Sequence, residues 1–194
     1  MASGAKDAYE IEKSLQFSRS DSAKLTWNPG GGATSYRKWT FSAWVKRAGL
    51  GTVQIIFGSY SGSGTSDQDY NVLYFGSGDE LHFGAWTQDF IKTNRKFRDV
   101  GAWYHIVLVA NTLDVTTASE RLRMYINGVE ETSFATTNYP AEDYNLGVLR
   151  GNPHYLGWTN STHYYDGYLA EVYLIDSLPL TPSSFAETDS VTGE

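Results

Sequence analysis

Short apolar and β-branched runs recur along the whole chain of 194 residues, separated by clusters of glycine, serine, asparagine and aspartate. Few windows place apolar residues at the spacing of a helix. Runs of this kind are typical of the antiparallel strands of an all-β sandwich. The pattern predicts strands over residues 14–18, 24–27, 39–47, 52–60, 71–76, 80–86, 90–93, 103–111, 121–127, 154–158 and 167–176.

The segment RLRMYIN at 121–127 shows the alternation of a strand most clearly, since every second residue from Leu122 onward is apolar. A period of two predicts one buried face, with the arginines and Tyr125 on a face in water. The dipeptide that follows, Asn127-Gly128, suits a type I′ turn, in which both central residues need a positive φ. A tight hairpin is therefore predicted here.

Two other runs, 103–111 and 167–176, are apolar on both faces. Such strands are expected at the centre of a sheet and covered on both sides, as in sheets packed face to face. One helical turn is predicted near the end of the chain, where Thr181 can cap and Pro182 can take the first helical position.

The composition excludes several classes of protein. There is no cysteine, which rules out disulfide scaffolds, cysteine metal sites and thiol catalysis. The formal net charge of −7 disfavours nucleic-acid binding, because phosphate neutralisation needs basic side chains. One basic cluster is interpreted as a solvated face, with a contact for an acidic polysaccharide as the alternative. It consists of Lys92, Arg95, Lys96 and Arg98.

The N-terminal segment is polar and shows no signal peptide, and no run approaches the roughly 18 apolar residues of a membrane helix. We therefore expect a protein that does not insert into membranes and is intracellular or released without a signal peptide. The expected organisation is an N-terminal lead (1–13), one β domain (14–189) and a short tail (190–194). The abrupt end is consistent with a domain cut from a longer protein.

The sequence offers little to a catalytic mechanism. Glycosidases on β-sandwiches use two carboxylates on one strand face, and the usual E-x-D-x-E spacing is absent. Glu171 and Asp176 lie five residues apart, so a regular strand would direct them to opposite faces. Four scattered histidines define no nucleophile and base, and His105, in the middle of a packed strand, is expected to be structural. The chain is predicted not to be an enzyme.

Two loops carry oxygen ligands of the kind that calcium prefers. The segment SDQDYN at 66–71 presents acids and an amide at alternating positions, and AEDYN at 141–145 presents a second group. The alternative is that these residues serve turns, as Asp and Asn in loops usually do. The candidate calcium ligands are Asp67, Asp69, Asn71 and Asp143.

Aromatic residues in polar loops are the candidates for sugar binding. The C–H face of a sugar stacks on an aromatic ring, and its hydroxyls need carboxylate or amide partners. The alternative is packing, because large rings dominate the cores of β-sandwiches. The candidate carbohydrate-binding residues are Tyr60, Tyr70, Tyr139, Tyr144, Trp158, Asn160, Tyr164 and Tyr165.

Four segments follow one another in the order and spacing of laminin-G-like domains: TFSAWVKR, WYHIVLVAN, RLRMYINGVE and YYDGYLAEVYLIDSLPLTPSSF. Across about residues 14–189 the chain resembles this family. The resemblance implies a two-sheet antiparallel jelly-roll sandwich of the concanavalin A-like kind. It also implies binding to carbohydrate or protein, often with one calcium ion at the rim or inside the fold.

A narrower likeness concerns SLQFSRSDSAKLTW and DGYLAEVYLIDSLPLTPSSFAETD, which resemble lectin-like domains of structural or tail-associated proteins of marine bacteriophages. This implies a virion protein made in a bacterial cytoplasm, whose domain binds a glycan on the host surface without catalysis. The alternatives are an assembly module that contacts other virion proteins and, more weakly, a glycan-cleaving enzyme. A homo-oligomer is compatible with any of these functions.

Overall fold

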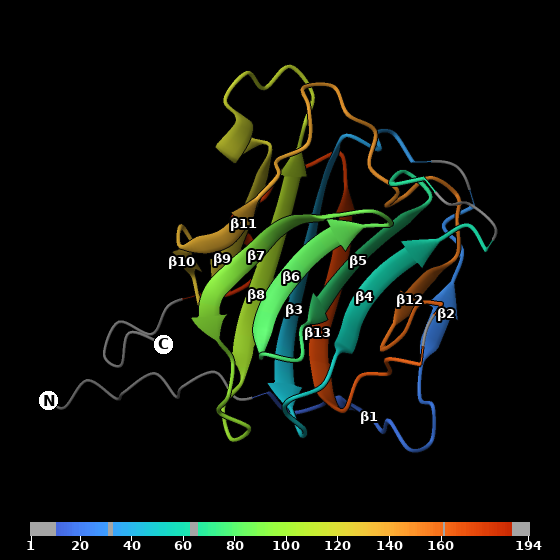
Figure 1. The fold of residues 1–194 in the computed structure, drawn as a ribbon, viewed down its shortest axis with the longest axis vertical. Coiled ribbons are helices and arrows are strands. Elements are labelled where there is room, and N and C mark those ends of the chain that lie inside the picture. Colours follow the sequence, from blue (N-terminus) through green and yellow to red (C-terminus); the bar gives the residue numbers. More distant parts are fainter. Residues whose placement is uncertain (1–10, 31–32, 63–65, 161, 188–194) are drawn as a thin grey trace, which may run out of the picture.

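Two antiparallel sheets pack face to face in the computed structural model, which describes residues 11–30, 33–62, 66–160 and 162–187 (Figure 1). The six-stranded sheet has the order β1 (Leu15–Phe17), β13 (Gly167–Asp176), β3 (Lys38–Arg47), β8 (Tyr104–Asn111), β9 (Leu122–Ile126) and β10 (Val129–Glu130). The seven-stranded sheet has the order β11 (Phe134–Thr137), β7 (Asp89–Lys96), β6 (Glu80–Ala85), β5 (Tyr70–Phe75), β4 (Gln54–Tyr60), β12 (His154–Leu156) and β2 (Leu25–Trp27). The predicted all-β, two-sheet jelly-roll sandwich is confirmed.

Each segment predicted as a strand overlaps an observed strand. The sequence missed β10 and β11, which are short, largely exposed strands at the two sheet edges on one side of the sandwich. It also missed the 3-10 helix η1 (Ala118–Glu120). The turn predicted at Pro182 is the 3-10 helix η2 (Pro182–Ser184), although Thr181 makes no side-chain capping bond to it.

The core lies between the two sheets and is rich in aromatic side chains. Trp39 and Phe41 from β3 are fully buried against the facing sheet. Phe41 stacks on Phe57 of β4 with ring centroids 4.6 Å apart, and Trp39 meets Phe83 edge-on at 5.7 Å. These contacts hold the seven-stranded sheet in place and fix which face of each strand points away from the core.

The hairpin predicted after residue 126 is confirmed. Asn127 and Gly128 have φ values of 50° and 79°, as a type I′ turn requires, and Ile126 pairs with Val129. The prediction that the other face of β9 lies in water was wrong at Tyr125. This ring is buried in a small cluster with Val107 and Val109 of β8, which Phe185 partly covers.

The expectation that both apolar runs are covered on both faces holds for β8 and fails for β13. From Tyr104 to Asn111, β8 runs between β3 and β9 and is buried almost throughout. The second half of β13 is only partly covered, and Tyr173 is exposed. An apolar run alone could not distinguish these cases, because β13 has only the three-residue strand β1 on its other side.

A bulge also changes how the carboxylates of β13 lie. The register shifts between Ala170 and Tyr173, and Glu171 has a φ of 48°. The regular alternation used to separate Glu171 from Asp176 therefore does not apply. Asp176 has a structural part instead, because its carboxylate accepts the backbone N–H groups of Thr34 and Ser35.

The chain ends fall largely outside the described residues. Of the predicted lead, residues 11–13 precede β1 without regular structure. Residues 1–10, and the predicted tail at 190–194, are not described. Within the described part, no helix is long and apolar enough to cross a membrane.

His105 is buried on the outer face of the six-stranded sheet, stacked on Trp44 at 4.9 Å and bonded through Nε2 to Oγ of Ser42. Burial lowers its pKa to about 4. In the unfolded chain a histidine takes up its proton near pH 6.5. Between these values the unfolded state binds the extra proton, so stability falls as the pH drops from about 6.5 towards 4.

We therefore expect the free energy of unfolding to decrease by at most about 1.4 kcal/mol per pH unit through this group. Urea titrations between pH 7.5 and 4.5 measure the slope. The variant His105→Gln should give a shallower slope, although His154, whose pKa burial also lowers, leaves part of it. Equal slopes in the two proteins would show that His105 is not responsible.

Candidate functional site

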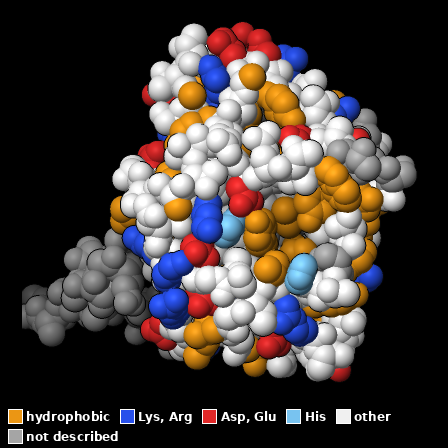
Figure 2. All heavy atoms as spheres, viewed as in Figure 1, with side chains coloured by type: hydrophobic (Ala, Val, Ile, Leu, Met, Phe, Trp, Pro, Cys, Tyr) orange, Lys and Arg blue, Asp and Glu red, His pale blue; other side chains and the backbone are white. Residues whose placement is uncertain are grey.

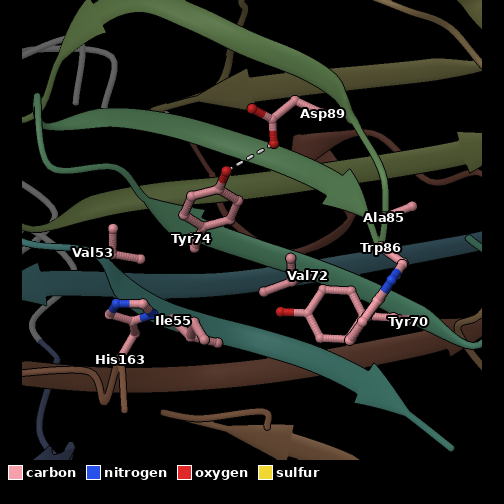
Figure 3. A pocket seen from close by; sticks show the side chains of 9 residues that line it. All are labelled: Val53, Ile55, Tyr70, Val72, Tyr74, Ala85, Trp86, Asp89 and His163. Atoms are coloured by element: carbon pink, nitrogen blue, oxygen red, sulfur yellow. Dashed lines mark hydrogen bonds between the residues drawn. The ribbon is translucent and has the colours of Figure 1, made fainter. Parts of the chain in front are cut away.

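The outer face of the seven-stranded sheet carries a hollow of about 300 Å³. Figure 2 shows hydrophobic side chains gathered over the middle of this face, with acidic and basic side chains to one side of them. The residues that line the hollow come from β4, β5, β6 and β7, from the segment just before β4, from the turn after β6 and from the loop before β13 (Figure 3). Its volume lies at the small end of the range of roughly 300–1,000 Å³ for ligand pockets.

The alternation of β5 places one set of side chains in this hollow. Tyr70, Val72 and Tyr74 occupy every second position and line it. The intervening residues Leu73 and Phe75 are fully buried in the core on the opposite face. A strand presents successive side chains to opposite faces, so core packing at Leu73 fixes the outward direction of its neighbours.

Glycines on both sides of Val72 shape the hollow. Val72 pairs with Gly84 of β6, and Gly84 pairs with Asp89 of β7. A Cβ at Gly84 would lie 2.8 Å from Oδ1 of Asp89, so glycine leaves the space that this carboxylate occupies. On the other side Val72 pairs with Gly58, where a Cβ would collide with the side chain of Thr159. Thr159 thus brings the loop after β12 against the sheet.

Three aromatic rings stand together at one end of the hollow. Tyr60 and Trp86 are nearly parallel, with centroids 6.1 Å apart and an interplanar angle of 8°. Tyr70 is edge-on to both, at 5.7 Å from each centroid. Its hydroxyl is 3.2 Å from Oγ1 of Thr159. Trp86 is 43% exposed, so this end of the hollow offers an aromatic surface to solvent.

A second aromatic group continues from the first. Tyr155 of β12 pairs with Gly58 of β4, which places it on the same outer face. Trp158 meets Tyr155 edge-on at 4.9 Å and stacks against Tyr164 at 6.2 Å. Nζ of Lys24 lies 3.9 Å from the centre of the Trp158 ring. The two groups form what we call the aromatic row, which consists of Trp158, Tyr155, Tyr60, Tyr70 and Trp86.

The opposite wall of the hollow carries a hydrogen-bonded group centred on Asp89. The Tyr74 hydroxyl donates to Oδ1 of Asp89 at 2.8 Å (Figure 3). Nδ1 of His82 lies 2.9 Å from Oδ2 of the same carboxylate. The Tyr74 and His82 rings stack at 4.5 Å. Burial raises the pKa of Asp89, but the hydrogen bonds from His82 and Tyr74 outweigh it and hold that pKa below its usual range. Asp89 is therefore an ionised acceptor at neutral pH.

Each side chain of the basic cluster seen in the sequence pairs with an acid. Glu80 pairs with Lys96 and with Lys92, and the hydrogen bond from Lys96 lowers the pKa of Glu80 to about 2. Arg95 lies 3.1 Å from Glu131, and Arg98 lies 3.1 Å from Asp79. These pairings favour the solvated-face interpretation over a contact for an acidic polysaccharide.

The residues proposed as calcium ligands do not converge on one point. The carboxylate of Asp67 accepts hydrogen bonds from Thr87 and Gln88. Asn71 is fully buried, and its amide oxygen accepts the N–H of Gly147. Its pairing in β5 holds it in the core, although the sequence suggested it as a ligand together with Asp67.

The two other calcium candidates are engaged elsewhere. Asp69 accepts a hydrogen bond from Ser66, and Asp143 pairs with Arg37 at 3.1 Å. Among the described residues, no group of three or more His, Asp or Glu side chains is arranged to hold a metal ion. The four candidate ligands therefore do not form one cluster of side chains in the described part of the chain.

The structure brings together some of the predicted sugar-binding residues and separates others. Tyr60, Tyr70, Trp158 and Tyr164 belong to or contact the aromatic row. Asn160 is exposed in the same loop as Trp158. The remaining three candidates, Tyr139, Tyr144 and Tyr165, pack with the core.

Tyr165 leaves no ring face for a sugar. It is fully buried, its hydroxyl donates to the carbonyl oxygen of Lys46 at 2.7 Å, and its ring meets Phe17 edge-on. Tyr144 meets Phe90 edge-on at 6.1 Å, which explains its partial burial. The criterion used in the sequence analysis, an aromatic residue in a polar segment, did not distinguish these buried residues from exposed ones.

Sequence reasoning missed Trp86, Tyr155, Tyr74 and Asp89. Trp86 and Tyr155 were assigned to strands, where aromatic side chains are usually buried. One signal was available: Trp86 is followed by Thr, Gln and Asp, a polar turn that leaves a large ring with little to cover it. Asp89 reaches the hollow because β7 pairs with β6, and this pairing could not be inferred from the sequence.

The sequence matches the Laminin_G_3 family, described as the concanavalin A-like lectin/glucanases superfamily, over residues 18–184. The chain belongs to this superfamily, and the laminin-G-like resemblance of its motifs is confirmed. A search of curated proteins found no match.

Several solved structures share the fold at low sequence identity. The CBM40 of the Ruminococcus gnavus IT-sialidase, bound to α2,3-sialyllactose, has a TM-score of 0.60 at 10% identity, covering 90% of this chain and 95% of its own. The heptameric SAP-like pentraxin of Limulus polyphemus has a TM-score of 0.54 at 17% identity, covering 96% and 86%.

Domain 4 of the Geobacillus stearothermophilus arabinanase AbnA, in complex with arabinotriose, has a TM-score of 0.52 at 22% identity. The match covers 77% of this chain and 65% of that domain. The chain thus corresponds to slightly less than two thirds of it. These similarities concern the fold.

Proposed function

We propose that this protein is a non-catalytic carbohydrate-binding domain whose site is the aromatic row and the adjoining hollow. The observation that carries the proposal is the exposed ring of Trp86, parallel to Tyr60, in the lining of a hollow whose opposite wall carries the ionised carboxylate of Asp89. Ligand sites combine apolar and aromatic surface with a few placed polar groups. Sugars match this combination, because they present apolar C–H faces and hydroxyl donors together.

The comparisons support this proposal. Two domains of the same fold were solved with sugars bound, α2,3-sialyllactose in one and arabinotriose in the other. Because fold alone does not define function, the argument rests on the exposed aromatic rings of this chain rather than on the similarity.

The state of the carboxylates on this face disfavours the alternative of a glycan-cleaving enzyme. Glycosidases need one carboxylic acid with a raised pKa to protonate the leaving group. On the outer face, the Lys96 hydrogen bond holds the pKa of Glu80 to about 2, and the hydrogen bonds at Asp89 keep its pKa low. Both groups are ionised at neutral pH, so neither is suited to act as the acid.

The biological setting that we propose is attachment of a virion to its host. It rests on the resemblance of residues 14–27 and 166–189 to lectin-like domains of marine bacteriophage proteins. A domain with one aromatic face for a surface glycan is suited to such a role. Glycans from the host surface are therefore the first ligands to test.

The first experiment is binding of the labelled domain to a panel of bacterial and algal glycans, in calcium and again with chelator. We expect binding to at least one glycan, with affinity unchanged by the chelator, because the aromatic row needs no metal. No cleavage product should appear in the same incubation. Loss of binding with chelator would instead identify a calcium-dependent lectin.

Two further outcomes would contradict the proposal. Folded protein that binds no glycan would favour the second function considered, an assembly module for other virion proteins. Shortened oligosaccharides after incubation would indicate an enzyme. Circular dichroism of the same sample provides the control that the domain is folded.

A further inference from the structure

The floor of the hollow differs from its aromatic end. Val53, Ile55, Val72 and Ala85 form it, and three of these side chains are almost fully buried (Figure 3). An aliphatic floor has no flat ring face on which a pyranose could stack. It suits a small apolar group that enters the hollow and loses contact with water.

The carboxylate of Asp89 stands beside this floor. Val72, Gly84 and Asp89 are consecutive partners across three strands, and the missing side chain of Gly84 leaves nothing between the other two. An ionised carboxylate has about four acceptor positions and donates nothing. Tyr74 and His82 occupy one position on each oxygen, so acceptor capacity remains for a ligand donor.

The charge of the lining disfavours an anionic ligand. Among the described residues that line the hollow, Asp89 supplies a carboxylate and none is a lysine or arginine. Lys92 acts on Asp89 electrostatically, but it pairs with Glu80 at 3.7 Å. A carboxylate or sulfate on the ligand would meet a like charge, with no lysine or arginine among the described lining residues to offset it.

We propose, on the basis of the function proposed above, that the hollow selects a neutral acetamido sugar. The methyl group lies on the floor formed by Val72 and Ile55, and the amide N–H donates to Asp89. The sugar ring remains at the aromatic end and stacks on Trp86. An acetamido group is the one common sugar substituent that joins a methyl group to a hydrogen-bond donor without adding charge.

The test compares matched ligands that differ at one substituent. Isothermal titration calorimetry is run with β1,4-linked tetramers of N-acetylglucosamine, glucosamine and glucose, and with the methyl glycosides of N-acetylgalactosamine and galactose. In at least one series we expect the acetamido ligand to bind about tenfold or more tightly than its hydroxyl counterpart, since a buried methyl group and a hydrogen bond both contribute.

Two variants locate the preference in this hollow. Val72→Thr keeps the shape of the side chain but places a hydroxyl on the floor, so the ratio of acetamido to hydroxyl affinity should fall about tenfold. Asp89→Asn should weaken acetamido binding similarly by removing an acceptor. Val129→Thr, at an exposed valine of β10 in the other sheet, is the matched control and should change nothing.

The outcomes separate the two proposals. If glycans bind but acetamido and hydroxyl ligands do so equally, or if an anionic sugar binds best, this inference is overturned and the carbohydrate-binding function stands. A preference that survives in Val72→Thr with an unchanged melting temperature also overturns it. If no glycan binds at all, the proposed function itself fails.

Discussion

Replacement of Trp86 by alanine is expected to weaken glycan binding about thirtyfold or more while leaving the fold intact. Truncating a central tryptophan of a binding surface typically costs 2 kcal/mol or more, which corresponds to a factor of about thirty in affinity. Trp86 is 43% exposed and lies at the end of β6, so its removal leaves little or no cavity in the core. Titration with the best ligand of the glycan panel measures the loss.

A matched control is available on the other sheet. Tyr173 of β13 is 44% exposed and, like Trp86, touches an aromatic neighbour, here Phe185 at 5.8 Å. Tyr173→Ala should leave glycan affinity unchanged. Melting temperatures of both variants check that each remains folded. Equal affinities for Trp86→Ala and the wild-type protein would show that sugars do not bind at the aromatic row.

The core was predictable from the sequence because the buried residues of a strand fall at every second position, and the apolar residues follow the same period. In RLRMYIN and in the strand at 39–47, the residues that pack between the sheets recur with the period of a strand. The Asn127-Gly128 turn was equally readable, since few other dipeptides tolerate its backbone. The prediction failed where coverage came from distant parts of the chain, as at Tyr125 under Phe185.

The candidate site was predictable only in part because it depends on strand order. Tyr60 and Tyr70 were found as aromatics beside a polar loop. Asp89 and Tyr155 reach the same face only through the pairing of β7 with β6 and of β12 with β4. Local chemistry cannot reveal such neighbours, because the partners are distant in the sequence or are positioned by a bulge.

The calcium hypothesis also shows that local sequence does not determine which side chains lie together. Asp67, Asp69 and Asn71 alternate in the sequence, and this suggested ligands on one side of a loop. Asn71 lies in β5, however, and its side chain is buried in the core, while Asp67 remains at the surface. The spacing of ligand residues is informative only when the segment that carries them has one conformation.

A buried arginine, Arg47, lies where β3 ends, close to the end of β7. Its contacts concern stability rather than binding. The Arg47 side chain is fully buried, lies 3.1 Å from Oδ1 of Asp79 and donates to the carbonyl oxygen of Phe97 at 2.7 Å. Its guanidinium also stands 4.3 Å from the centre of the Phe75 ring. Asp79 accepts the N–H of Gly51, so one carboxylate joins several connecting segments.

Arg47→Met is expected to lower the free energy of unfolding by about 3–5 kcal/mol, because it leaves the Asp79 carboxylate buried with one partner fewer. Arg98→Met is the matched control. It removes the other arginine at the same carboxylate, but from a side chain that is 63% exposed, and should cost less than about 1 kcal/mol. Urea denaturation followed by tryptophan fluorescence measures both changes.

A third variant separates lost attraction from the cost of an unpaired charge. Asp79 has a φ of 69°, a conformation that asparagine tolerates, so Asp79→Asn should keep the turn. If the uncompensated carboxylate dominates, Arg47→Met combined with Asp79→Asn will be more stable than Arg47→Met alone. Similar losses for Arg47→Met and Arg98→Met, or no recovery in the double variant, would instead assign the stability of this end of the sandwich to packing around Phe75 and Phe97.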